Sequence, residues 1–528
     1  TSDEKNDDEK RKPIRDFSKK LLGRIVFLHF LQKKGWLGCS VLKTKKENDE
    51  IWVDGNPNFM LDLYRNFNDK EHFYSKCLTA LFFNTLNEPD RKNNVFVITN
   101  NRVPYLNGGL FDNDQKHTDG IDFSASYFLD LLEFFEQYNF TIDENSPDEQ
   151  EVGIDPEMLG HIFENLLEEN REKGAFYTPK EIVHYMCQES LVQYLKNHLR
   201  DEALVEEFVR EQQVSAYLRD KANAIQLNTL LDEVKVCDPA IGSGAFPMGI
   251  LQEIYKAKIH IYPYLKSQTP FDPAETKKKI IEESIYGVDL EHGAVEIARL
   301  RFWLSLVVDE DIPQPLPNLD YKIMQGNSLL EKFEEIDLSQ VGSAKKNVKV
   351  VEPERDLFGH IKDGQMKMTF TQSETVKEIQ KLIKKYFNEK NPIDKADLQN
   401  QINNKVHQHI DYNLELRESQ LVRLITEAGN ETNLNARART KLEGLKRDLA
   451  ALSQTRAKLH KVQNLKEKPY FIWHLFFKDV FDNKGFDIVI GNPPYIQLQK
   501  DGGSLAKLFE NSGYETFGRM GDIYSLFY

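Results

Sequence analysis

The chain has 528 residues, of which 40% are hydrophobic and 29% charged, so it holds enough apolar material for buried cores in more than one domain. It has no apolar run near the roughly 18 residues of a membrane helix, and its first fifteen residues are too polar for a signal sequence. Its four cysteines lie far apart, which excludes a dense disulfide framework and a zinc knuckle. The formal net charge of -15 argues against a surface wholly coated by DNA but is compatible with a local basic cleft. Taken together, these features predict a soluble, cytoplasmic, multidomain protein with no membrane partner.

The N-terminal region is predicted to be helical. Between about residues 14 and 37, apolar side chains such as Leu21, Ile25 and Leu28 recur at helical spacing among Lys and Arg. A turn-rich stretch follows at 103–111, where Asn107-Gly-Gly indicates a tight reversal. We assign residues 1–150 to a helical N-terminal or connector domain.

Strand and helix patterns alternate in the next region. Short apolar, β-rich runs at 234–237, 285–288 and 321–324 are separated by helical stretches near 246–260 and 293–308. This alternation predicts an α/β domain with a parallel sheet. We assign residues 151–330 to its first part.

A highly charged stretch then interrupts the alternation. Residues 331–470 hold few strand signals, and the leucines within them recur at helical spacing (Leu442, Leu445, Leu449, Leu452 and Leu459). We expect a helical hairpin or short coiled coil inserted into one domain. The α/β pattern resumes at 486–490 with the apolar character of a buried central strand, so residues 471–528 are expected to complete that domain.

The first motif with chemical content is Asp238-Pro-Ala-Ile-Gly-Ser-Gly-Ala-Phe246, between a predicted strand and a predicted helix. Gly242 and Gly244 allow a tight turn and a close approach of a ligand to the backbone. A lone Gly-x-Gly is weak evidence for a nucleotide site. This motif also differs from a dinucleotide fingerprint, because it lacks the third spaced glycine.

Two further strand ends carry polar candidates. Asp289 ends the strand at 285–290, where a carboxylate accepts hydrogen bonds from vicinal ribose hydroxyls. The same residue suits a helix N-cap, and both roles can hold together. Asn327 follows the third strand and is a weaker candidate, because a plain turn explains it nearly as well.

The decisive motif is Gly491-Asn-Pro-Pro-Tyr495, directly after the strand at 486–490. The two prolines fix the backbone and carry no N–H, so nearby carbonyls can face a ligand. The Asn492 side-chain oxygen and the Pro493 carbonyl can accept both hydrogens of an exocyclic amine, while Tyr495 offers a ring on which a base stacks. A rigid surface turn or a proline-rich ligand is the alternative, which the position after a strand and downstream of the glycine motif disfavours.

A fourth motif, Gly174-Ala-Phe-Tyr-Thr-Pro179, precedes a predicted helix for which Thr178 or the next turn is the expected cap. In this order the four motifs resemble the gamma-class DNA adenine-N6 methyltransferases, and more closely the type IIG (Eco57I-like) restriction-modification enzymes. The likeness runs from about residue 103 to the end and includes the stretches 159–165 and 471–481.

The resemblance implies a Rossmann-like methyltransferase sheet that binds S-adenosylmethionine, with double-stranded DNA as partner. The catalytic motif would be Asn492, Pro493, Pro494 and Tyr495. The implied cofactor-binding residues are Phe176, Tyr177, Thr178, Pro179, Asp238, Pro239, Ala240, Gly242, Gly244, Asp289, Leu290 and Asn327.

Two departures from the family accompany the resemblance. Family members continue into the rest of the catalytic sheet and a target-recognition domain, so we expect this sequence to be a piece of a longer protein. No persuasive nuclease centre is found: Glu233-Val-Lys235 fits only the short pattern and leads into the cofactor strand. No metal site is predicted, since His407, His409 and Asp411 lie in a stretch that looks helical and solvated.

The function expected from these motifs is methyl transfer to adenine N6 of a flipped base, as part of a restriction-modification enzyme. An RNA or protein methylase with the same motif is an alternative. A second alternative is a non-catalytic DNA-binding or assembly module, in which the 331–470 helices contact protein partners.

Overall fold

The fold is given by a computed structural model, which describes residues 2–41, 52, 54–89, 91–107, 109–112, 121–138, 178–211, 216–265, 269–333, 336–338, 370–429, 436–462, 468, 470–510 and 512–528. These residues form two compact units. Unit 1 comprises residues 1–324, 387–392 and 486–528, and unit 2 comprises residues 325–386 and 393–485. Among the helices of the described ranges, none is long and apolar enough to cross a membrane.

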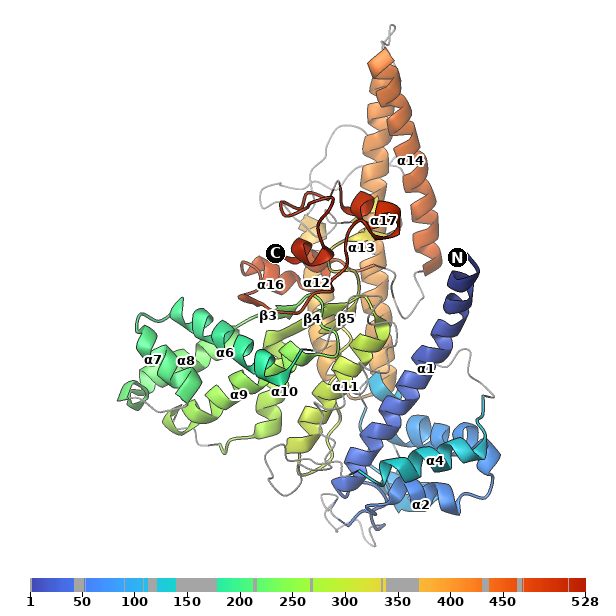
Figure 1. The fold of residues 1–528 in the computed structure, drawn as a ribbon, viewed down its shortest axis with the longest axis vertical. Helices are drawn as coiled ribbons and strands as arrows, with labels where there is room; N and C mark the ends of the chain where they lie inside the picture. The colour runs from blue at the N-terminus through green and yellow to red at the C-terminus, as the bar shows by residue number, and fades with distance from the viewer. Residues whose placement is uncertain are drawn as a thin grey trace. The chain divides into compact units, whose positions relative to one another are not determined.

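Unit 1 is built on a parallel sheet of four strands in the order β5-β4-β3-β8 (Figure 1). Its strands are β3 (Val236–Asp238), β4 (Ile285–Asp289), β5 (Ile323–Gln325) and β8 (Ile488–Val489). Val236 lies opposite Ile285 of β4 on one side and Ile488 of β8 on the other. The predicted parallel sheet is therefore confirmed, and its last strand follows the residues of unit 2 in the chain.

The strand β8 differs from the expected buried central strand. It has two residues, lies at the edge of the described sheet, and its Val489 is 61% exposed. An apolar run has the same sequence pattern whether one or both of its faces are covered, so periodicity could not separate the two cases.

Helices surround the sheet, as Figure 1 shows for α9 (Ala245–Leu265), α10 (Pro273–Ser284) and α11 (His292–Asp309). The helix α11 is buried over most of its surface from Gly293 to Val307, because most of its side chains there are apolar. Trp303 donates its indole N–H to the carbonyl of Pro317 at 2.9 Å, which satisfies the polar atom of this buried ring.

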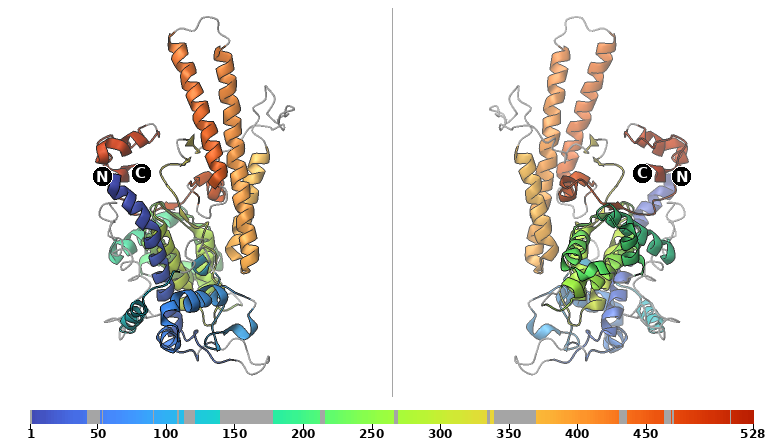
Figure 2. Two further views of the ribbon diagram at one scale, coloured as in Figure 1. Left: turned by 90° about the vertical axis from the view of Figure 1, so that its right-hand side faces the viewer. Right: turned by 90° about the vertical axis from the view of Figure 1, so that its left-hand side faces the viewer.

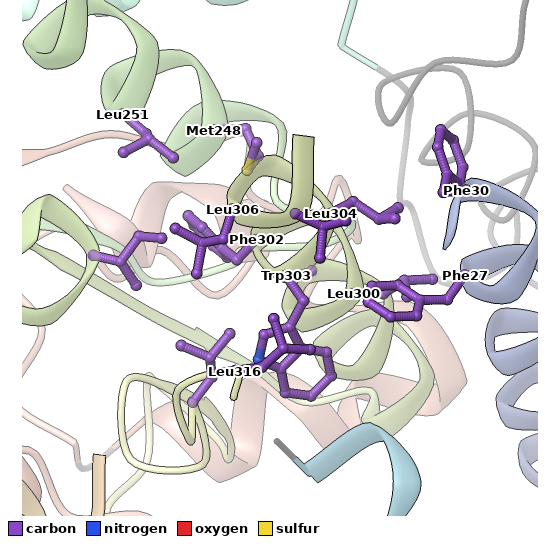
Figure 3. Packing of buried hydrophobic residues seen from close by; sticks show 14 of the residues in the cluster. Phe27, Phe30, Met248, Leu251, Leu300, Phe302, Trp303, Leu304, Leu306 and Leu316 are labelled. Atoms are coloured by element: carbon purple, nitrogen blue, oxygen red, sulfur yellow. The ribbon is translucent and has the colours of Figure 1, made fainter. Parts of the chain in front are cut away.

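The N-terminal helices share one hydrophobic core with the sheet. The predicted N-terminal helix is present as α1 (Ser2–Lys33), and Figure 3 shows its Phe27 beside Leu300 of α11. The stretch expected to be turn-rich also belongs to this core, because Val103, Leu106, Leu110 and Phe111 are buried.

The remaining elements of unit 1 are short or flank the sheet. They include α2 (Phe59–Asn66), α3 (Thr79–Leu81), β1 (Val95–Phe96), β2 (Asn101–Arg102), α4 (Ala125–Phe135), α6 (Lys180–Lys196), α7 (Glu202–Glu206), α8 (Lys221–Glu233) and α17 (Lys500–Phe509).

Unit 2 contains long helices and one small hairpin of strands. Its elements are β6 (Lys332–Phe333), β7 (Ile336–Asp337), α12 (Phe370–Asn388), α13 (Pro392–Gly429), α14 (Ala436–Val462), α15 (Trp473–Phe476) and α16 (Lys478–Asp482), of which α12 and α13 each run into unit 1 at one end. Figure 2 shows α13 and α14 side by side. The predicted helical hairpin is therefore present.

The packing of α6 on α9 generates a stability prediction. A Cβ at Gly249 of α9 would stand 2.6 Å from Cγ1 of Val183 and 2.9 Å from Sγ of Cys187, both on α6. Gly249→Ala should lower the free energy of unfolding by about 1–3 kcal/mol, because α6 must shift to admit the methyl group. Urea unfolding followed by circular dichroism measures the change.

Gly444→Ala in α14 is the matched control, because a Cβ there meets nothing within 4 Å. Removing this glycine should raise stability by about 0.5–1 kcal/mol. A Gly249→Ala protein as stable as the wild type would contradict the close packing of α6 on α9.

Candidate functional site

The candidate site lies where β3, β4 and β8 end. Because these strands run parallel, their carboxyl ends meet at one edge of the sheet, which is where ligands bind in open α/β folds. Asp238 ends β3, Asp289 ends β4, and the Gly491–Tyr495 segment follows β8. The motifs predicted from the sequence at these three strand ends are thus brought together.

The glycine loop between β3 and α9 takes a conformation that requires glycine. Gly242 and Gly244 have φ angles of +53° and +87°, in the left-handed region. A Cβ at Gly244 would lie 3.2 Å from Cβ of Ala298, so the loop also approaches α11 closely. Arg301 of α11 stabilises the loop by donating a hydrogen bond to the Ser243 carbonyl at 3.0 Å.

Asp289 ties this loop to β4. Its carboxylate accepts a hydrogen bond from the Gly242 N–H at 2.8 Å and another from the Glu291 N–H at 2.8 Å. Burial raises the pKa of Asp289, while these N–H groups act to lower it. The N-cap of α11 is Glu291, so Asp289 braces the turn before the helix rather than capping it. The adjacent Leu290 is 64% exposed.

Asp238 is a buried carboxylate with no cationic partner among the described residues. It is 1% exposed and accepts a hydrogen bond from the Ala240 N–H at 3.0 Å. Burial, followed by the nearby negative charge of Asp289, raises the pKa of Asp238 to about 8. A Cβ at Gly491 would stand 2.5 Å from Oδ1 of Asp238, so only glycine fits where the Gly491–Tyr495 segment packs against Asp238.

Asn492 joins the last motif to the Thr178-Pro179 segment. Its side-chain amide donates from Nδ2 to the Thr178 hydroxyl at 3.1 Å. Thr178 is therefore not the cap of α6: Pro179 holds the N-cap position and makes no side-chain capping bond. A contact across more than 300 residues of sequence fixes the orientation of the Asn492 amide.

Tyr495 has a second aromatic ring beside it. Tyr495 is 51% exposed, and its ring centroid lies 5.5 Å from that of Tyr524, which is 38% exposed. Asp522 holds the two segments together, because its carboxylate accepts from the N–H groups of Ile496 and Tyr524 at 2.9 and 3.2 Å. Sequence reasoning missed Asp522 and Tyr524, although Gly521-Asp-Ile-Tyr contains an Asp at a helix start.

The other predicted residues divide into three groups. Pro239, Ala240, Pro493 and Pro494 are half-buried in the loops that follow β3 and β8. Asn327 belongs to unit 2, where its side-chain oxygen accepts from the N–H groups of Leu329 and Leu330 at 3.0 Å each and closes a turn. Phe176, Tyr177 and the stretch 159–165 lie outside the described residues.

The histidine-rich stretch of α13 is helical but not solvated, which corrects the expectation. His407 and His409 are each 5% exposed, and the His407 ring contacts the ring of His460 on the neighbouring helix α14. His407 Nε2 lies 3.1 Å from His460 Nδ1 of α14, and burial lowers the pKa of His407. Across the described ranges, no group of three or more His, Cys, Asp or Glu side chains is arranged to hold a metal ion.

Two parts of the chain match known protein families. Residues 283–528 match the family described as Eco57I restriction-modification methylase, and residues 214–345 match the DNA-methyltransferase domain of MmeI. Residues 283–528 are thus similar to Eco57I-type methylases. The resemblance to type IIG (Eco57I-like) restriction-modification enzymes is confirmed by these matches.

The chain is also similar in sequence to individual restriction enzymes and methyltransferases. A protein named as a type II restriction enzyme and methyltransferase, RM.MjaORFECS2P of Methanocaldococcus jannaschii, is 26% identical over 523 residues, which cover 91% of this chain and 41% of that protein. The type II restriction enzyme and methyltransferase RM.Eco57I of Escherichia coli is 24% identical over 272 residues, covering 44% of this chain and 24% of its own. The chain thus spans 41% and 24% of the length of these two relatives.

A solved structure of the type IIL restriction-modification enzyme MmeI in complex with DNA is also similar. It matches with a TM-score of 0.41 and 18% identity, over 75% of this chain and 46% of the MmeI chain.

The buried carboxylate of Asp238 generates a pH prediction. The unfolded chain releases the Asp238 proton near pH 3.8, whereas the folded protein keeps it to about pH 8. Folding stability should fall as the pH rises through this window, by at most about 1.4 kcal/mol per pH unit. Asp238→Asn should therefore stabilise the ligand-free protein more at pH 8.5 than at pH 4.5, which thermal unfolding measures.

Asp220→Asn is the matched control, because Asp220 is an exposed N-cap of α8 and Asn caps equally well. A stability difference between Asp238→Asn and wild type that does not change with pH would contradict the protonated carboxyl.

Proposed function

We propose that the chain is the methyl-transfer part of a site-specific DNA methyltransferase, which moves a methyl group from S-adenosylmethionine to adenine N6 in a restriction-modification enzyme. The observation that carries the proposal is the hydrogen bond between Asn492 and Thr178 at the carboxyl edge of the sheet. It joins the motif expected to hold the target amine to the motif expected to hold the cofactor. The matches to restriction-modification methylases support the same function.

The residues at the strand ends suit S-adenosylmethionine. Open space lies beside Gly242, where a Cβ would meet nothing within 4 Å. Asp289 is half-buried at the end of β4, and its oxygens keep lone pairs with which to accept from a ribose diol. Asp238 is a carboxylate without a cationic partner in the described chain, and a ligand ammonium nearby would favour its charged form.

S-adenosylmethionine, when bound, supplies a methyl group on a positively charged sulfur that is open to direct attack. The chain's own contribution is orientation. In a carboxamide the oxygen points away from the nitrogen, so donation from Asn492 Nδ2 to Thr178 aims Oδ1 away from Thr178. That oxygen and the Pro493 carbonyl would accept both N6 hydrogens and hold the nitrogen lone pair toward the methyl group.

An adenine base reaches this site only outside the duplex. Flipping the base costs a few kcal/mol, and stacking on an aromatic ring returns roughly 1–3 kcal/mol. The half-exposed ring of Tyr495, with Tyr524 at 5.5 Å, forms the stacking surface of the proposed pocket. No covalent intermediate is needed, and none of the four cysteines takes part, since all are buried.

RNA and protein are the alternative substrates, because methylases of either class can carry an Asn-Pro-Pro-Tyr motif. DNA is favoured because the matched families are restriction-modification and DNA methylases. Parallel transfer of labelled methyl groups to DNA, RNA and protein separates the three substrate classes.

The cofactor part of the proposal predicts calorimetric binding of S-adenosylmethionine to the chain. Asp289→Ala should weaken it by about 10- to 100-fold or more, because a hydrogen bond to a charged group contributes roughly 1.5–3 kcal/mol. Asp479→Ala, an exposed aspartate of α16, is the control and should bind as the wild type does. Equal binding by the Asp289 and Asp479 variants would remove Asp289 from the site.

The catalytic part predicts that Asn492→Ala lowers methyl transfer to DNA by about 100-fold or more while S-adenosylmethionine binding is kept. The lost amide oxygen aligned the target amine and made no contact needed by the cofactor. Single-turnover transfer, with digestion to nucleosides to identify N6-methyladenine, gives the rate and the product.

Two further variants sharpen this test. Thr178→Val should slow transfer less than Asn492→Ala, because it removes only the hydrogen bond that orients the amide, and Thr178→Ser should restore it. Asn483→Ala, at an exposed asparagine after α16, should leave the rate unchanged. Wild-type rates in the Asn492→Ala protein would overturn the catalytic assignment.

A further inference from the structure

The helix α14 is strongly basic within an acidic chain. It holds eight Lys and Arg residues and two acidic residues, whereas the whole chain has a formal net charge of -15. Its partner in the hairpin, α13, holds four Lys and Arg residues and six acidic residues. Positive charge is therefore concentrated on one helix of unit 2.

Four of these cations lie on one side of α14. At 100° per residue, Arg439, Lys446, Arg447 and Lys461 fall within a sector of roughly 100°, which we call the basic face. The leucines fall in a sector of similar width on the opposite side, where Leu452 and Leu459 are buried. All four cations of the basic face are exposed, and Glu443 is the acidic residue among them.

The acidic residues of α13 do not neutralise the basic face. Arg456, on the inner side of α14, pairs with Asp411 at 2.7 Å, with Glu418 at 2.7 Å and with Glu415 at 3.6 Å. These three carboxylates are therefore committed to one inward-facing arginine. Within the described residues, no carboxylate forms an ion pair with any of the four cations of the basic face.

We propose that the basic face of α14 binds the backbone phosphates of duplex DNA. Exposed cations without carboxylate partners create a positive field that attracts a polyanion, and each phosphate contact releases condensed counterions. From Arg439 to Lys461 the helix rises by about 33 Å. Duplex DNA carries one phosphate for about every 1.7 Å of its axis, so phosphates are available along the whole face.

This inference rests on the proposed function for its choice of duplex DNA, and it adds a DNA contact outside the methyl-transfer site. Contacts to phosphates carry no sequence information, so the basic face would strengthen binding equally on all sequences. Its loss should leave the cofactor site unaffected.

The test replaces all four cations with glutamine (Arg439→Gln, Lys446→Gln, Arg447→Gln and Lys461→Gln). The affinity of the 528-residue chain for a fluorescein-labelled 30-base-pair duplex is measured by anisotropy at several salt concentrations. The slope of log K against log salt should become shallower by about 3 to 4, because each lost phosphate contact removes roughly 0.9. Helix content should be kept, since glutamine is a good helix former and all four sites are exposed.

The matched control removes four exposed cations from unit 1 (Lys92→Gln, Arg200→Gln, Arg219→Gln and Lys221→Gln). Its slope should stay near that of the wild type. An unchanged slope in the α14 variant, or an equal loss in the control, would overturn the basic face as a DNA contact.

Cofactor binding and methyl transfer are measured on the same proteins. Wild-type protein that binds DNA through α14 but transfers no methyl group would count against the proposed function and support the basic face. Methyl transfer by a wild-type protein whose affinity for DNA does not depend on α14 would support the proposed function and count against the basic face.

Discussion

Parallel pairing of β3 with β4 and β8 is the constraint on which the site depends. Register places Val236 opposite both Ile285 and Ile488, so the loops after all three strands emerge at the same edge. A shift of one residue in β8 would reverse the faces of its side chains and move Gly491 away from Asp238. The sheet thereby converts residues distant in sequence into one local arrangement.

The site is costly for the fold that carries it. Of two carboxylates at adjacent strand ends, Asp238 is buried and Asp289 half-buried, neither with a cation from the described chain, and two glycines are held at positive φ. Backbone N–H groups offset part of this cost at both carboxylates. Such polar groups at strand ends are typical of places where binding, rather than folding, determines which residues are present.

Sequence reasoning located the strands and the strand-end motifs, because alternation of apolar runs with amphipathic helices is a local signal. It could not predict that Asn492 bonds Thr178, or that Asp522 holds Tyr524 beside Tyr495, since both contacts depend on how distant segments meet. The exposure of Val489 and the burial of His407 were missed for the same reason. The cofactor roles of Asp289 and Asn327 remain predictions.

The place of unit 2 in the chain also affects how the protein is made. The neighbouring strands β3 and β8 are separated by about 250 residues, and closing a flexible loop of that length costs about 5 kcal/mol of chain entropy. Contacts between residues so far apart slow folding, and a hairpin that folds by itself shortens the effective loop. During synthesis the glycine motif emerges long before Asn492, so the complete edge of the sheet can form only after the inserted helices have been translated.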